Sequence, residues 1–101
     1  MKAFRFSRLA EADLLSIAAY TLRTWGEVQT NRYIDQLQDC CRYLAANPGS
    51  GRPCDHIRHV LCRGETGKHV IFFPRDPMGI LISRILHERM LPGKHALNDE
   101  D

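Results

Sequence analysis

The chain has 101 residues, which suits one compact domain and leaves no room for two. Hydrophobic residues make up 44% and charged residues 26%, the balance of an ordinary globular protein. No apolar run approaches the roughly 20 residues that span a bilayer, and acidic and arginine residues come too early at the N-terminus for a signal peptide. We therefore expect a cytoplasmic protein with no membrane segment, whose four cysteines stay reduced.

Positive charge gathers in the second half of the chain, although the formal net charge is only +2. Residues 1–50 hold six Lys/Arg against five Asp/Glu, and residues 51–96 hold eight against four. Such an excess suits an acidic partner or nucleic acid, but it is also typical of a well-solvated surface. The last residues, 97–101, are mostly acidic. We expect a single domain over 1–96 followed by a flexible acidic tail.

A short strand and a helix are predicted first. Residues 2–6 alternate and place Phe4 and Phe6 on one side, as in a strand. Ser7 then offers a hydroxyl that can cap a helix. The helix has apolar positions at spacings of three and four, namely Leu14, Ile17, Ala18, Thr21, Leu22 and Trp25. We therefore expect one buried face on this helix, with Trp25 in the core.

A second helix is predicted to begin near Glu27, because Gly26 breaks the first. Its buried positions also alternate by four and three: Thr30, Ile34, Leu37, Cys41 and Leu44, with Tyr33 and Cys40 widening the stripe. The run Asn47-Pro48-Gly49 stops this helix. Because the joint at Gly26 is short, the two helices should form an antiparallel hairpin.

Three short strands are predicted after the helices, at residues 57–63, 68–73 and 79–87. They are rich in β-branched and aromatic residues and are separated by glycine and proline, so a meander is expected. The order β-α-α-β-β-β predicts an α+β domain. The helical hairpin would cover one face of a small, mainly antiparallel sheet.

The segment 46–59 contains glycines beside basic residues, as phosphate-binding loops do. It follows a helix and precedes a strand, however, which is the reverse of the arrangement in which a helix N-terminus holds the phosphate. The four possible metal ligands in and after it are Cys54, His56, His59 and Cys62. Their spacing matches no zinc pattern, and His59 and Cys62 would point to opposite faces of a strand. We predict neither a metal site nor a cofactor.

A basic sheet side is the remaining candidate site. Its members are Arg58, Arg63, Lys68, Arg84, His87 and Arg89. These side chains could hold phosphates or stabilise the transition state of RNA cleavage, or they could simply keep an exposed face soluble. No nucleophile–base–acid triad is supported, because the serines Ser7, Ser16 and Ser83 lie in regular elements without a sharp turn around them.

Four segments together resemble the ParE branch of the RelE/ParE toxin superfamily. They are "AEADLLSIAAYTLRTWGEVQTNRYIDQL", "NPGSGRP", "GKHVIFF" and "RILHERM", in this order, and the resemblance covers residues 3–92. In such proteins the second of these segments joins the helical hairpin to the sheet. The resemblance implies a toxin of a type II toxin–antitoxin pair that is held inactive by a cognate ParD-like antitoxin.

The superfamily implies two mechanisms. ParE-like members poison DNA gyrase, whereas RelE-like members cleave mRNA on the ribosome with basic residues and a tyrosine or histidine. The tyrosines of this chain, Tyr20, Tyr33 and Tyr43, all lie on predicted helices, so none should serve from the sheet. For a nuclease, His87 would work with Arg84, Arg63 and Glu65. Arg84 and His87 would face opposite sides of a strand unless a bulge intervenes, which favours the ParE-like mechanism.

The predicted contact residues follow from this interpretation. We expect Arg84, His87 and Arg89 to contact the target, and the antitoxin to contact Arg58, Arg63, Lys68, Tyr20 and Leu22. No helix-turn-helix or ribbon motif is present, so sequence-specific DNA binding would have to come from the antitoxin. An inactive relative that only binds its antitoxin is a third interpretation.

Overall fold

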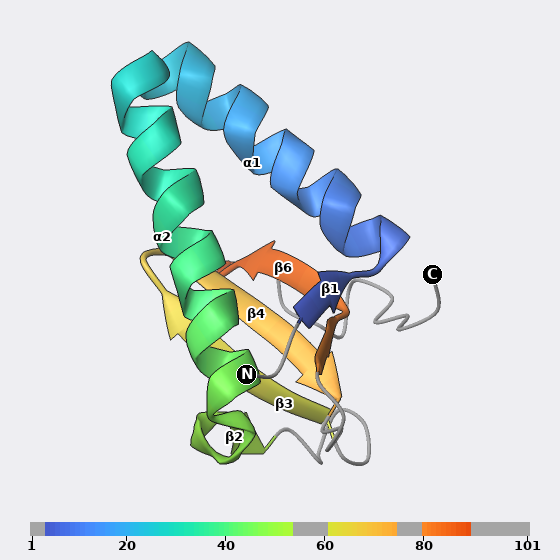
Figure 1. Ribbon diagram of the computed structural model, residues 1–101. Helices are drawn as coiled ribbons and strands as arrows, with labels where there is room; N and C mark the ends of the chain where they lie inside the picture. The colour runs from blue at the N-terminus through green and yellow to red at the C-terminus, as the bar shows by residue number, and fades with distance from the viewer. Residues whose placement is uncertain (1–3, 54–60, 75–79, 90–101) are drawn as a thin grey trace.

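Two helices form an antiparallel hairpin that lies across one face of a small sheet (Figure 1). The computed structural model describes residues 4–53, 61–74 and 80–89. Its elements are β1 (Phe4–Phe6), α1 (Arg8–Trp25), α2 (Glu27–Ala46), the short 3-10 helix η1 (Pro48–Ser50), β2 (Arg52–Pro53), β3 (Leu61–Thr66), β4 (His69–Pro74), β5 (Ile80–Ile82) and β6 (Arg84–His87). Within the described residues, neither helix is long and apolar enough to cross a membrane.

The strands form two hydrogen-bonded groups. Four strands pair in the order β2-β3-β4-β6, and each pair is antiparallel. The first strand, β1, pairs instead with β5, and this pair is parallel. The predicted fold class, a helical hairpin on a mainly antiparallel sheet, is confirmed. The structure adds the short edge strand β2, which the sequence did not predict.

The prediction of one continuous strand over residues 79–87 is wrong. The chain bends at Ser83, so that β5 pairs with β1 whereas β6 pairs with β4. The N–H of Ser83 donates to the carbonyl of Phe72 at 2.7 Å, while Phe72 is also the register partner of Arg84. Ser83 and Arg84 thus both lie opposite Phe72, and two residues opposite one define a β-bulge. Because of the bulge, the continuous segment 80–87 pairs with β1 through β5 and with β4 through β6.

The other strand limits differ by a few residues from those predicted. β3 extends to Thr66 rather than ending at Arg63, and β4 runs from His69 to Pro74. The rest of the predicted segment 57–63, its first four residues, lies outside the described residues. In β1, the rings of Phe4 and Phe6 lie on one side with their centroids 5.5 Å apart, as the alternation predicted.

Helix α1 begins at a serine that also contacts the bend in the sheet. The Ser7 hydroxyl accepts a hydrogen bond from the N–H of Ala10 at 3.0 Å, the expected capping bond. The same hydroxyl donates to the carbonyl of Ser83 at 2.7 Å, and the N–H of Ser7 donates to the carbonyl of Ile82 at 2.9 Å. The cap therefore attaches the start of α1 to the end of β5 and to the bend that precedes β6.

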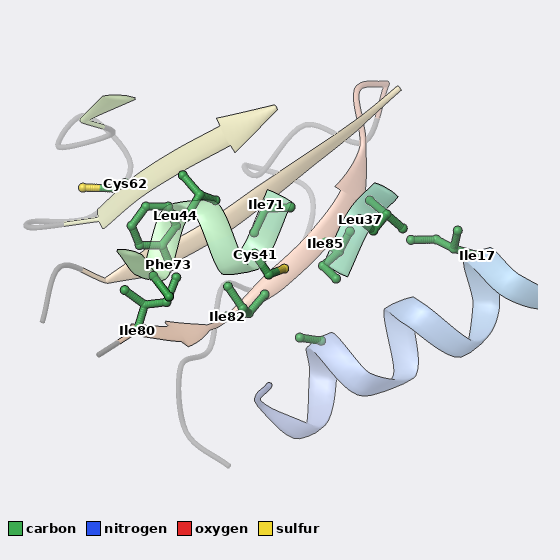
Figure 2. Packing of buried hydrophobic residues seen from close by; sticks show 12 residues of the cluster. Ile17, Leu37, Cys41, Leu44, Cys62, Ile71, Phe73, Ile80, Ile82 and Ile85 are labelled. Atoms are coloured by element: carbon green, nitrogen blue, oxygen red, sulfur yellow. The ribbon is translucent and has the colours of Figure 1, made fainter. Parts of the chain in front are cut away.

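The main core lies between α2 and the sheet (Figure 2). The predicted stripe of α2 is confirmed: Thr30, Leu37, Cys41 and Leu44 are buried, and Ile34, Tyr33 and Cys40 pack against the core. Burial raises the pKa of Cys41 to about 12, so this thiol stays protonated and packs as an apolar group. A second buried cluster consists of Leu61, Val70, Phe72 and Leu86. These four alternate along their strands with main-core residues, so they lie on the opposite face of the sheet.

The predicted buried face of α1 is only partly correct. Ile17 and Thr21 are buried, but Leu22 and Trp25 are exposed, and Trp25 is not in the core. Leu22 lies five positions from Ile17 and so points away from the buried face of the helix. For Trp25 the reason is that the tip of the hairpin extends beyond the edge of the sheet (Figure 1). The last turns of α1 therefore have no strand beneath them.

Two leucines on the two helices provide a test of this burial pattern. Leu37 is 1% exposed and Leu15 is 72% exposed. Leu37→Ala should lower the free energy of unfolding by about 2–5 kcal/mol, because it leaves a cavity in the main core. Leu15→Ala, its matched control, should change it by at most about 0.5 kcal/mol. Urea denaturation of both variants measures the difference, and equal losses would contradict the described core.

Candidate functional site

Arg84, a predicted target contact, is held by Asp13 of α1. The Arg84 guanidinium donates from Nε to Asp13 Oδ2 at 2.7 Å and from Nη2 to Oδ1 at 2.9 Å. Asp13 Oδ2 also accepts the N–H of Ile85 at 2.9 Å. The side chains of Arg84 and Asp13 are 13% and 14% exposed, and the hydrogen bond with Asp13 raises the pKa of Arg84 above its ordinary value. This bidentate pair connects α1 to β6.

Sequence reasoning missed this role of Asp13. An acidic residue near a helix N-terminus is usually explained by the helix dipole, and nothing local signals a partner 71 residues away. The two carboxylate oxygens of Asp13 instead accept hydrogen bonds from β6.

The other residues predicted for RNA cleavage lie apart from His87. Glu65 forms an ion pair with Arg52 of β2. Arg63 is the register partner of Phe72, so it lies on the sheet face that holds the second cluster. His87 is the register partner of His69, whose ring contacts α2 on the other face. The geometry therefore does not gather Arg63, Glu65 and His87 into one site.

His87 belongs to a different cluster, which sequence reasoning missed. The hydroxyl of Tyr33 lies 2.5 Å from Nδ1 of His69, and the His69 and His87 rings meet edge to face with centroids 5.4 Å apart. Tyr33 lies on α2 as predicted, and its long side chain carries the hydroxyl to His69 of β4. That no tyrosine serves in RNA cleavage stays a prediction. Burial raises the pKa of Tyr33, and burial together with His87 lowers the pKa of His69.

The residues predicted for antitoxin binding are scattered. Tyr20, Leu22 and Lys68 are exposed, and Arg63 is half-buried. Arg58 lies outside the described residues. Arg89, the remaining predicted target contact, is exposed next to His87, where its backbone N–H donates to Nδ1 of that histidine at 3.1 Å.

Leu22 is part of an exposed apolar stripe on α1. Leu15, Leu22 and Trp25 are 72%, 52% and 69% exposed. Their spacings of seven and three place them on one side of the helix, and we call them the α1 stripe. Tyr20 lies two residues from Leu22 and so projects from nearly the opposite flank. Val28, also exposed, follows the stripe at the start of α2.

Metal ligation finds no support among residues 4–53, 61–74 and 80–89, which contain no group of three or more His, Cys, Asp or Glu residues that could hold an ion. Of the four candidate ligands, Cys62 is buried in the main core. The other three, Cys54, His56 and His59, lie outside the described residues.

Exposed leucine and tryptophan side chains in a row are typical of a surface that binds another protein. The fold and the α1 stripe thus define a small α+β domain with an exposed apolar surface on its first helix. The family model described as ParE toxin of type II toxin-antitoxin system, parDE, matches residues 4–92. The chain therefore belongs to the ParE toxin family.

Curated relatives match nearly the whole chain. Toxin ParE1 of Caulobacter vibrioides is 37% identical over 94% of this chain and 98% of its own length. Toxin ParE of Escherichia coli is 37% identical over 89% of this chain and 88% of its own length. A solved structure described as the chromosomal ParDE TA system from P. aeruginosa has a TM-score of 0.71 at 23% identity, covering 86% of this chain and 96% of that chain. This likeness confirms the fold.

The Asp13–Arg84 pair can be tested against an exposed acidic residue on the other helix. Asp13→Ala should lower the free energy of unfolding by about 2–3 kcal/mol, because Arg84 and the Ile85 N–H both lose a charged acceptor. Asp39→Ala, which breaks the exposed pair of Asp39 with Arg42, should cost at most about 0.5 kcal/mol. Both changes introduce alanine into a helix, so helix propensity largely cancels. Chemical denaturation measures the free energy of unfolding of both variants. An equal loss would show that the Asp13–Arg84 pair stabilises the fold no more than an exposed ion pair does.

Proposed function

We propose that this protein is the toxin of a type II toxin–antitoxin pair, that a ParD-like antitoxin neutralises it in the cytoplasm, and that it acts by inhibiting DNA gyrase. Membership of the ParE toxin family supports the first part. The single observation that carries the rest is the α1 stripe, because it offers apolar anchors for a protein partner outside the main core.

The antitoxin segment that fits this surface is amphipathic and acidic. Apolar side chains would cover the α1 stripe and supply most of the affinity. Acidic side chains would meet the basic second half of the chain, where Lys68 and Arg89 are exposed, and would speed association.

Action by binding, without chemistry of the toxin's own, is supported by the placement of the predicted nuclease residues. Arg84 is held by Asp13, Glu65 by Arg52, and Arg63 faces the second cluster. A nuclease would need a phosphate-binding cation and a proton donor or acceptor around one reacting group.

Mechanism is tested by two assays on one preparation of toxin. Purified toxin should impair gyrase supercoiling or trap cleaved DNA, and it should leave ribosome-bound mRNA intact. His87→Ala should weaken the gyrase effect only as the loss of a contact does, without abolishing it, because no proton is transferred. If mRNA is cleaved, and His87→Ala lowers the cleavage rate by about 10²-fold while gyrase is unaffected, the RelE-like mechanism replaces this proposal. Activity in neither assay would favour the inactive relative.

Antitoxin binding is tested at Trp25. Trp25→Ala should weaken the affinity for the cognate antitoxin about tenfold or more, chiefly through faster dissociation, while the stability of the toxin stays nearly unchanged. Tyr43→Ala removes another exposed aromatic side chain, from the far end of α2, and serves as the matched control. Surface-based kinetics measure both rate constants. Equal affinities for the two variants would remove the α1 stripe from the interface.

A further inference from the structure

A half-buried end of the sheet is joined to α2 through three aromatic side chains. Tyr33 comes from the second turn of α2, His69 is the first residue of β4, and His87 is the last residue of β6. The turn before β4 is shaped around the tyrosine: Gly67 has φ +56°, and a Cβ there would lie 2.7 Å from the Tyr33 ring. The backbone N–H of Lys68 donates to the Tyr33 oxygen at 3.3 Å.

These contacts suit a neutral His69. The Tyr33 oxygen accepts the N–H of Lys68, and its own hydroxyl proton finds an acceptor when Nδ1 of His69 is unprotonated. In that tautomer His69 carries its proton on Nε2. Protonation of Nδ1 would reverse the bond: the Tyr33 oxygen would have to accept from both donors, and its hydroxyl proton would lose the His69 acceptor.

The charges around His69 do not compensate for this reversal. Burial lowers the pKa of His69 most, and His87 on β6 lowers it further. Asp13 on α1 and Glu88 after β6 act in the opposite direction and less strongly. Asp13 is paired with Arg84, and Lys68, in the turn next to His69, carries a positive charge. Burial and His87 therefore favour the neutral form of His69, and the two acidic residues oppose it only weakly.

We propose that Tyr33, His69 and His87 form a proton-sensitive latch that fastens α2 to the β4–β6 end of the sheet and loosens on acidification. The latch goes beyond the proposed function, since it concerns the toxin fold by itself. Because α2 packs against α1, loosening it would also disturb the support of the α1 stripe.

The sign of the pH dependence follows from the lowered pKa of His69. In the unfolded chain this histidine has its ordinary pKa of about 6.5, so below that pH the unfolded state binds the proton more readily than the folded state. The contribution to stability is fully present above about pH 6.5. It is lost as the pH falls from that value toward the folded pKa.

The test compares wild type with His69→Asn, whose side-chain oxygen can still accept near the position of Nδ1 but does not titrate. Urea unfolding midpoints and amide hydrogen exchange are measured between about pH 7.5 and pH 5, across the ordinary range of histidine. In wild type the midpoint should fall on acidification, and α2 and β4 amides should exchange faster at the lower pH after correction for the intrinsic rate, because the folded state binds the His69 proton less readily than the unfolded state. In His69→Asn this fall should be largely absent.

An NMR titration of the histidine rings gives an independent readout in the wild-type protein. His69 should titrate below about 6.5, and its pKa should move up in His87→Asn, which removes the neighbouring imidazole. If His69 titrates at or above its ordinary value, or if His69→Asn keeps the full pH dependence of wild type, the latch is overturned. Should His69→Asn fail to fold, the wild-type titration alone decides. None of these outcomes depends on gyrase or on an antitoxin.

Discussion

The contact between the start of α1 and the bend at Ser83 is the constraint on which the rest of the structure depends. Ser7 and Ser83 are fully buried, and the Ser7 hydroxyl both caps α1 and holds the Ser83 carbonyl. Since β5 pairs with β1 while β6 pairs with β4, this bend is where the two groups of strands meet. Asp13 then binds Arg84 and the Ile85 N–H just after the bend, which fixes α1 over β6.

This anchoring at one end of the hairpin explains what is left exposed at the other. α2 carries its apolar stripe across the sheet and forms the main core with it, while α1 leans on β6 by its first turns (Figure 1). The hairpin tip has no strand to cover, so Trp25 remains at the surface, and Leu22 points away from the buried face of α1. An exposed tryptophan beside leucines is poorly explained by the stability of the chain alone, whereas burial against a partner would account for it.

The same packing gives two charged residues a structural role in place of the catalytic role that the sequence suggested. Arg84 and Glu65 look like parts of a phosphate-cleaving site when they are considered only as residue types on strands. In the fold their charges are engaged by Asp13 and Arg52, so they contribute to the joints between elements. The histidines that do meet, His69 and His87, meet on the helix side of the sheet and join Tyr33 there.

The sequence by itself determined the two helices, the strand before them and the strand-rich segment after them. Periodicity and capping depend on neighbours within a few residues, which is why the α2 stripe, the Ser7 cap and the hairpin at Gly26 were all predicted correctly. Only the tertiary structure decided the break at Ser83, the pairing of β1 with β5, the Asp13–Arg84 bond and the reach of Tyr33 to His69. These join residues 36 to 76 positions apart, and no local pattern specifies such a partner. Trp25 shows the limit most directly: its helical spacing indicates a buried face, but burial also requires a strand opposite, and the length of the sheet decides that.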